Sequence, residues 1–137
     1  LEDLDVDLIV LAGYMKILTK AFTQRFPGRI LNIHPSLLPK YPGLHTYQRA
    51  LDNGEKEHGT TVHFVNEEID GGATVLQAKV PIFPGDTVKE IELRTREQEY
   101  HIYPLVIKWF IEERLKLENG IAYLDDSPLP ISGYAAE

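Results

Sequence analysis

Two short apolar runs place the strongest constraint on how this chain can fold. Residues 8–13 are apolar throughout and end in glycine, and residues 29–34 hold a second apolar run. A continuous apolar run of this length is typical of a strand buried on both faces, which implies a parallel sheet covered by helices. Residues 19–26 fit a short helix between the runs, ended by a proline and a glycine. These segments predict a βαβ unit in an α/β fold whose sheet is mostly parallel with flanking helices.

Strand and helix patterns continue through the middle of the chain. Residues 46–53 fit a helix that Gly54 closes. Residues 59–65 are rich in β-branched side chains and predict a strand, and residues 73–82 predict a second strand antiparallel to it. The acidic stretch 66–72 between them ends in two glycines and is expected to form a loop.

The last part of the chain predicts a long helix followed by a hairpin. Thr87 and Glu90 have the spacing of a capping box, and apolar side chains then recur near the helical period. Pro104 lies inside this helix and is expected to kink it. Asn119-Gly120 predicts the turn of a terminal hairpin, and we expect the tail from Asp125 to be irregular.

Composition excludes several classes of function. The 137 residues suffice for one domain and include no cysteine, which rules out disulfides, a thiol nucleophile and cysteine-ligated zinc, and fits a cytoplasmic protein. The net charge of −7 argues against nucleic acid as a partner. No apolar run reaches the roughly 18 residues that a membrane-spanning helix needs, and the acidic start lacks the basic region of a signal peptide.

Two polar side chains end the second apolar run. Asn32 and His34 are two positions apart, so an extended backbone presents them on the same face. Pro35 then favours an extended conformation at His34 and ends the strand. Open α/β sheets bind their ligands at such strand ends, although a lone histidine beside a strand is more often a hydrogen-bonded core residue.

Asp70 offers a carboxylate that could reach this pair. An aspartate before two glycines is commonly a turn residue, and the functional alternative is that it stabilises an imidazolium at His34. An imidazolium beside the Asn32 carboxamide suits a developing oxyanion, and such a histidine can also transfer protons. The constellation contains no activated nucleophile, because nothing marks Ser36 as one. We therefore expect a substrate to supply the nucleophile.

Three motifs together resemble the folate-dependent transformylases: Asn32–Pro39, His58–Phe64 and Asp70–Gly72. The segments 40–45 and 75–80 are similar in particular to the glycinamide ribonucleotide transformylases of purine biosynthesis. The resemblance extends from Leu8 to about Ala136. It implies the formyltransferase fold and a reaction in which the amino group of glycinamide ribonucleotide attacks the formyl carbon of 10-formyltetrahydrofolate, the cosubstrate.

The resemblance also implies roles for particular residues. The resemblance implies that Asn32, His34 and Asp70 are catalytic residues. It assigns folate contacts to Met15, Lys16, Ile17, Leu18, Asn32, Asn66, Glu67, Glu68, Ile69 and Asp70. It assigns ribonucleotide contacts to Arg96, Glu97, Gln98 and Glu99. Taken alone, residues 15–18 would be a plain connection, residues 66–70 an acidic turn, and Glu99 a salt-bridge partner at the edge of the helix's apolar stripe.

Some features depart from this family or fall outside it. Lys16 stands where members often carry arginine, a change that backbone contacts tolerate but a planar side-chain contact does not. His63 alternates with buried positions, which favours a packing role. We expect no metal site, because no histidine pair has the spacing of metal ligands beside a carboxylate.

The family's N-terminal strand and glycine-rich phosphate loop have no counterpart in this sequence. We therefore expect residues 1–137 to be the catalytic and folate-binding part of a single larger domain, with small-molecule partners, neither nucleic acid nor membrane, and a homodimer left open. Three alternatives remain: a 10-formyltetrahydrofolate hydrolase, a transfer-RNA formyltransferase, which the negative charge disfavours, and a non-catalytic folate-binding module.

Overall fold

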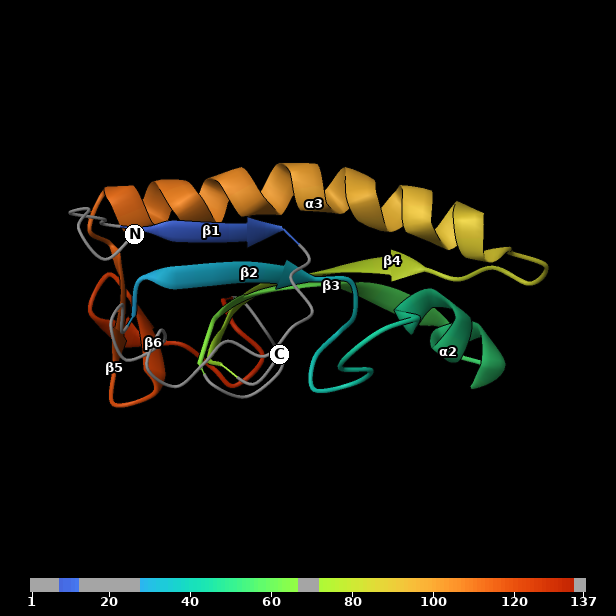
Figure 1. Ribbon diagram of the computed structural model, residues 1–137, viewed down its shortest axis with the longest axis horizontal. Helices are drawn as coiled ribbons and strands as arrows, with labels where there is room; N and C mark the ends of the chain where they lie inside the picture. The colour runs from blue at the N-terminus through green and yellow to red at the C-terminus, as the bar shows by residue number, and fades with distance from the viewer. Residues whose placement is uncertain (1–7, 13–27, 67–71, 135–137) are drawn as a thin grey trace.

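The computed structural model describes residues 8–12, 28–66 and 72–134, which form a mixed sheet beneath one long helix (Figure 1). The sheet has the strand order β1-β2-β3-β4, with β1 at Ile9–Ala12, β2 at Ile30–His34, β3 at Glu57–Phe64 and β4 at Thr74–Pro81. Helix α3 (Val88–Ile111) runs along one face of this sheet (Figure 1). The short helix predicted over residues 19–26 lies outside the described residues.

The pairing of the described strands corrects one part of the predicted fold class. The α/β architecture, the parallel pairing of β1 with β2 and the antiparallel pairing of β3 with β4 are confirmed. Strands β2 and β3 are also antiparallel, so the described sheet is not mostly parallel. The reason is visible in Figure 1: helix α2 (Thr46–Asp52) lies beyond the end of β2 and does not cross a face of the sheet. The chain therefore returns into β3 in the opposite direction, since a parallel return needs a crossover connection. The prediction that β1 is buried on both faces is also wrong in part, because Val10 is 44% exposed.

Helix α3 begins where the sequence predicts. Thr87 is its N-cap, and the Thr87 hydroxyl accepts a hydrogen bond from the backbone N–H of Glu90 at 3.3 Å. The helix continues through Pro104 as one gently curved element, where a kink was expected (Figure 1). Its buried positions are Ile91, Thr95, Val106 and Trp109.

The hydrophobic core lies between α3 and the sheet. Leu31, Ile33, Val62 and Phe64 pack against Val106 and Trp109 of the helix, together with Val75, Leu115, Ala122 and Leu124. Burying a side chain of this size stabilises the fold by roughly 1.5–3 kcal/mol. These contacts fix which face of β2 and β3 the helix covers, and so which face remains for other side chains.

The C-terminal segment forms a second, three-stranded sheet. Strand β5 (Leu115–Glu118) pairs with β6 (Ile121–Leu124) through the predicted turn, in which Asn119 and Gly120 have φ values of 51° and 75°. The tail is not wholly irregular, because a second tight turn leads into β7 (Ser127–Pro128). Asp125 in that turn accepts two hydrogen bonds at 2.9 Å from the Arg114 guanidinium, a contact across 11 positions that a local pattern does not reveal.

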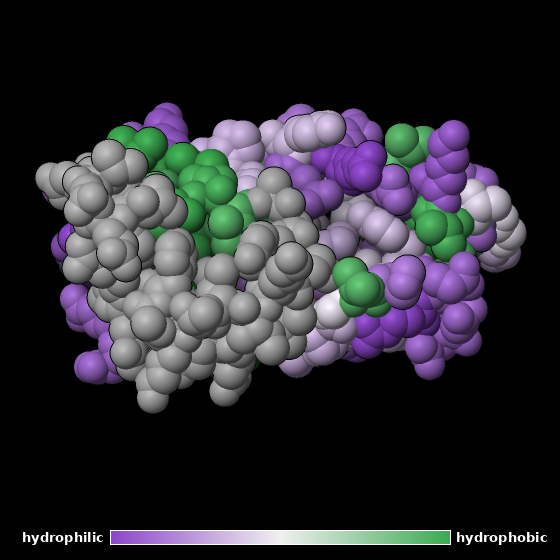
Figure 2. All heavy atoms as spheres, in the orientation of Figure 1, coloured by the Kyte–Doolittle hydropathy of each residue, from purple (hydrophilic) through white to green (hydrophobic). Residues whose placement is uncertain are grey.

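On the face shown in Figure 2, the described residues are mostly hydrophilic, with separate apolar patches. Among the described helices, none combines the length and the apolar character required to cross a bilayer.

Candidate active site

The two faces of the sheet differ in chemistry. Ile33 points toward α3, so Asn32 and His34 point away from it, as their spacing predicts. Strand pairing sets further side chains on this face, because Asn32 lies opposite His63, His34 opposite Thr61, and Thr61 opposite Gln77. We call this group the polar face: Asn32, His34, Thr61, His63 and Gln77. Asn32 and His34 are only 2% and 0% exposed.

The imidazole of His34 is held by a backbone carbonyl. Its Nε2 lies 2.8 Å from the Tyr41 carbonyl oxygen, and Nε2–H donates in this bond because a carbonyl oxygen only accepts. The neutral ring is thereby fixed as the Nε2–H tautomer, in which Nδ1 carries no proton. The predicted partner Asp70 lies outside the described residues, so its contact with His34 stays a prediction.

Sequence reasoning assigned His63 to packing, yet it belongs to the polar face. It is 1% exposed, and its Nδ1–H donates to the Phe64 carbonyl oxygen at 2.9 Å. Its place opposite Asn32 follows from the β2–β3 register, which no local pattern in the sequence fixes. The alternation that marked His63 as buried was correct, but the alternation did not reveal its neighbours.

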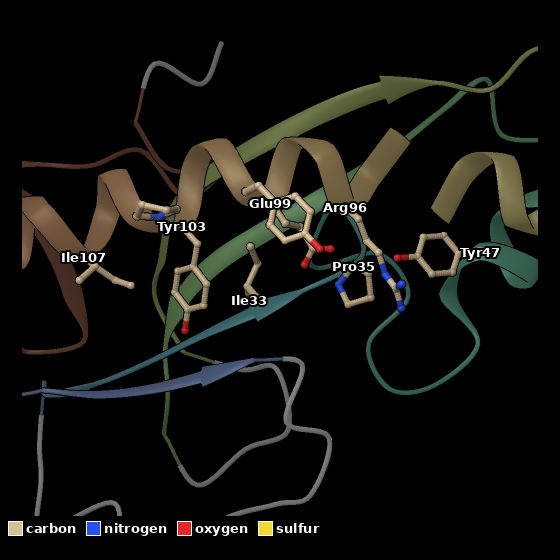
Figure 3. A pocket seen from close by; sticks show the side chains of 9 residues that line it. Ile33, Pro35, Tyr47, Arg96, Glu99, Tyr103 and Ile107 are labelled. Atoms are coloured by element: carbon tan, nitrogen blue, oxygen red, sulfur yellow. The ribbon is translucent and has the colours of Figure 1, made fainter. Parts of the chain in front are cut away.

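A pocket of about 510 Å³ lies on the other face, between α3 and the end of β2; we call it the helix-side pocket (Figure 3). Its lining consists of Ile33, Pro35, Tyr47, Arg96, Glu99, Tyr100, Tyr103, Pro104 and Ile107. Two of the four predicted ribonucleotide contacts, Arg96 and Glu99, are in this set, whereas Glu97 and Gln98 are not. Figure 3 shows the Arg96 and Glu99 side chains reaching from α3 toward the end of β2, with Tyr47 facing them from α2.

Burial raises the pKa values of two side chains that line this pocket, Glu99 and Tyr47. It raises the pKa of the Glu99 carboxyl, an effect that Arg96 and a hydrogen bond with the Thr60 hydroxyl oppose. Burial also raises the pKa of the Tyr47 phenol, and the negative charge of Glu99 adds to that shift. The pocket therefore suits a ligand that donates hydrogen bonds to Glu99, which would satisfy the half-buried carboxylate without adding negative charge.

The polar face and the helix-side pocket meet at the end of β2. Pro35 lines the pocket and directly follows His34, and the Thr60 hydroxyl donates to the His34 carbonyl oxygen at 3.0 Å. The structure thus places Asn32 and His34 on one face, and Arg96 and Glu99 on the other. A ligand held in the helix-side pocket would have to reach past Pro35 to meet Asn32 and His34.

His58 is a further buried histidine at this strand end. Its Nε2–H donates to the Pro35 carbonyl oxygen at 2.7 Å, and its ring meets the edge of the Tyr47 ring with centroids 5.3 Å apart. Burial lowers the pKa of His58, and the nearby His34 acts in the same direction, although the bond to Pro35 opposes both. His58 is therefore a neutral support for Pro35 and Tyr47.

Eight of the ten predicted folate contacts fall outside the described residues. These eight are Met15, Lys16, Ile17, Leu18, Glu67, Glu68, Ile69 and Asp70. Asn66 is described and is half-buried just after β3. Within the described ranges, no three histidine or carboxylate side chains gather closely enough to hold a metal ion.

Comparisons with known proteins agree with one another. The model of the formyl transferase family matches residues 1–107. A phosphoribosylglycinamide formyltransferase of Haemophilus influenzae is 74% identical over the whole chain, which covers 65% of that relative. The corresponding enzyme of Escherichia coli is 59% identical over 131 residues, and the match covers 96% of this chain and 62% of that relative. The chain therefore spans slightly less than two thirds of the length of these relatives.

Solved structures give the same result. A phosphoribosylglycinamide formyltransferase of Coxiella burnetii, solved with CHES, superposes with a TM-score of 0.88 at 49% identity, covering 93% of this chain and 60% of that chain. A formyltetrahydrofolate deformylase of Pseudomonas syringae superposes with a TM-score of 0.79 at 29% identity, covering 86% of this chain and 40% of that chain.

Proposed function

Because the chain belongs to the formyl transferase family, we propose that it transfers a formyl group from 10-formyltetrahydrofolate to the amino group of glycinamide ribonucleotide. The single observation that carries the proposal is the burial of Asn32 and His34 side by side on the polar face, at the end of β2. Relatives at 74% and 59% identity that are named phosphoribosylglycinamide formyltransferases support the choice of substrate.

The reaction needs a stabilised oxyanion and a path for one proton. The substrate amine attacks the formyl carbon, and the carbonyl oxygen becomes an oxyanion that the Asn32 carboxamide and a protonated His34 stabilise by donating hydrogen bonds. The bond from the formyl carbon to N10 of the folate then breaks. The protonated His34, assisted by Asp70, gives its proton to N10 and then takes up the proton lost by the attacking amine.

We assign the ribonucleotide to the helix-side pocket. Glu99 accepts hydrogen bonds from substrate hydroxyl or amine groups, which satisfies a carboxylate that burial makes costly to ionise. Arg96 supplies guanidinium donors on the same side of the pocket. Folate contacts from residues 15–18 and 66–70 and a cytoplasmic location belong to the same proposal, and formyl-folate serves as cosubstrate with no metal.

A formyl-folate hydrolase is the second candidate, and the resemblance to the Pseudomonas syringae deformylase favours it. The polar face suits both reactions, because attack by water also produces an oxyanion. The helix-side pocket discriminates between them, since a hydrolase has no need of an amine-bearing ribonucleotide.

The test is an ultraviolet assay of formyl-folate consumption with and without glycinamide ribonucleotide. We expect turnover only when the ribonucleotide is present. Equal turnover without it would identify a hydrolase, and folate binding without turnover would identify a non-catalytic binding module.

A further inference from the structure

The segment that covers the polar face is held in an unusual conformation. Residues 36–45, here called the cover loop, connect β2 to α2. Tyr41 and His45 have φ values of 53° and 58°, a left-handed conformation that costs a non-glycine residue about 1–3 kcal/mol. Contacts from the surrounding structure must offset this cost for the loop to keep its shape.

The first such contact comes from the Thr61 hydroxyl, which is fully buried beside His34 on the polar face. It donates to the Ser36 carbonyl oxygen at 2.7 Å and accepts from the Leu38 N–H at 3.1 Å. The Gln77 amide donates to the same hydroxyl at 3.0 Å and to the Leu38 carbonyl oxygen at 2.8 Å. One hydroxyl and one amide therefore fix the beginning of the cover loop to the sheet.

The second contact comes from Arg49 of α2. Its guanidinium donates to the carbonyl oxygens of Pro42 and Leu44 at 2.6 and 3.1 Å. The same group lies 5.2 Å from the centroid of the Tyr41 ring, which is a cation–π contact. Arg49 therefore holds the other end of the cover loop and the side chain of the left-handed Tyr41.

The carbonyl that fixes His34 lies between these two attachments. We propose that Thr61 and Arg49 are positioning residues for His34: by holding the cover loop at both ends, they keep the Tyr41 carbonyl against Nε2 and so set the orientation and tautomer of the imidazole. The expected effect on turnover rests on the proposed function, whereas the effect on the tautomer does not.

Two variants separate this role from general stability. Thr61→Val removes the hydroxyl at nearly constant volume, and Arg49→Ala removes the guanidinium from half-exposed α2, so it remains informative if Thr61→Val does not fold. Thr61→Ser retains the hydroxyl and should therefore behave like the wild type. Two matched controls are available. Thr95→Val alters a buried threonine whose hydroxyl donates a hydrogen bond to the Ile91 carbonyl oxygen within α3. Gln48→Ala alters an exposed side chain of α2.

The direct readout is the tautomer of His34, measured by nitrogen-15 NMR of the histidine side chains at a pH where the ring is neutral. We expect the Nε2–H form in the wild type, Thr61→Ser and both controls, and a mixture of tautomers in Thr61→Val and Arg49→Ala. In the transfer assay, the two variants should lose about tenfold to a hundredfold in kcat, the scale of losing an orienting partner.

Folded Thr61→Val and Arg49→Ala proteins that keep the wild-type tautomer would overturn the proposal, and if Thr61→Val is unfolded, Arg49→Ala decides alone. A wild type without transfer activity would refute the proposed function and leave the tautomer comparison as the test of positioning.

Discussion

Glu99 shows how a single half-buried carboxyl can make stability depend on pH. It lies half-buried in the helix-side pocket, where burial raises the pKa of its carboxyl more than Arg96 and Thr60 lower it. A carboxyl whose pKa is raised by folding stabilises the fold below the unfolded pKa. That contribution is lost as the pH rises through the folded pKa.

The first prediction concerns this pH dependence. Wild type should lose stability relative to Glu99→Gln as the pH rises from the ordinary glutamate pKa of 4.5 through the raised pKa, because only the wild type must ionise a half-buried carboxyl. Melting temperatures of both proteins across this range provide the measurement. Glu97→Gln, an exposed neighbour on α3, is the control. Parallel wild-type and Glu99→Gln curves would show that burial does not shift the pKa of Glu99.

Glu99→Gln also tests the assignment of the helix-side pocket. The amide keeps the shape of the side chain but accepts hydrogen bonds from the substrate less strongly, because it carries no charge. We expect the KM for glycinamide ribonucleotide to rise by about tenfold, the scale of one lost charge-assisted hydrogen bond, while the KM for formyl-folate stays unchanged. A rise in both KM values would mean that the carboxylate supports the whole site and not one substrate.

At the scale of elements, local chemistry explains what the sequence could predict. The period of two along β2 places Asn32 and His34 on one face without knowledge of any neighbour. The turn at Asn119-Gly120 and the cap at Thr87 are likewise encoded within a few residues. Pairing between distant segments is not encoded in this way. The polar face could not be completed from the sequence, because Thr61 and Gln77 join it only through the register of β3 and β4.

The same distinction between local and long-range information explains which predictions were wrong: the direction of β3 and the irregular tail after residue 125. The direction of β3 depends on where α2 packs, and the last turn depends on a contact between Arg114 and Asp125 across the hairpin. Neither is visible in a local pattern of apolar or turn-forming residues. The folate contacts assigned to residues 15–18 and 67–70 lie outside the described residues and remain predictions.

The capping of α3 gives a prediction at this scale. Thr87→Ala removes the hydroxyl that accepts the Glu90 N–H, and should lower the free energy of unfolding by about 1 kcal/mol. Thr87→Ser should retain most of the stability, and Lys89→Ala in the same turn is the control. Urea denaturation provides the measurement, and an unchanged Thr87→Ala midpoint would contradict the role of this cap.

At the scale of the whole molecule, the sheet separates two groups of polar side chains. Arg96 and Glu99 lie on the helix side and Asn32 and His34 on the other. If the proposed assignment holds, the two substrates approach the end of β2 from different faces. A bulky side chain that fills the helix-side pocket should therefore leave binding on the side of the polar face intact.

Ile107→Trp tests this separation, because Ile107 lines the helix-side pocket, on the opposite side of the sheet from the polar face. The larger side chain should raise the KM for glycinamide ribonucleotide by at least about tenfold by overfilling the pocket, with little change for formyl-folate. Ile111→Trp, an exposed position one helical turn further along α3, is the control. Equal losses for both substrates would place them on the same side of the sheet.

The most direct test of the whole account is the rate of formyl transfer to glycinamide ribonucleotide by wild type and by His34→Ala, followed by ultraviolet absorbance. The account predicts ribonucleotide-dependent turnover in the wild type and a loss of at least about a hundredfold in a folded His34→Ala protein, the usual scale for an oxyanion-stabilising or proton-transferring group. A His34→Ala rate close to that of the wild type, or turnover that does not need the ribonucleotide, would contradict it.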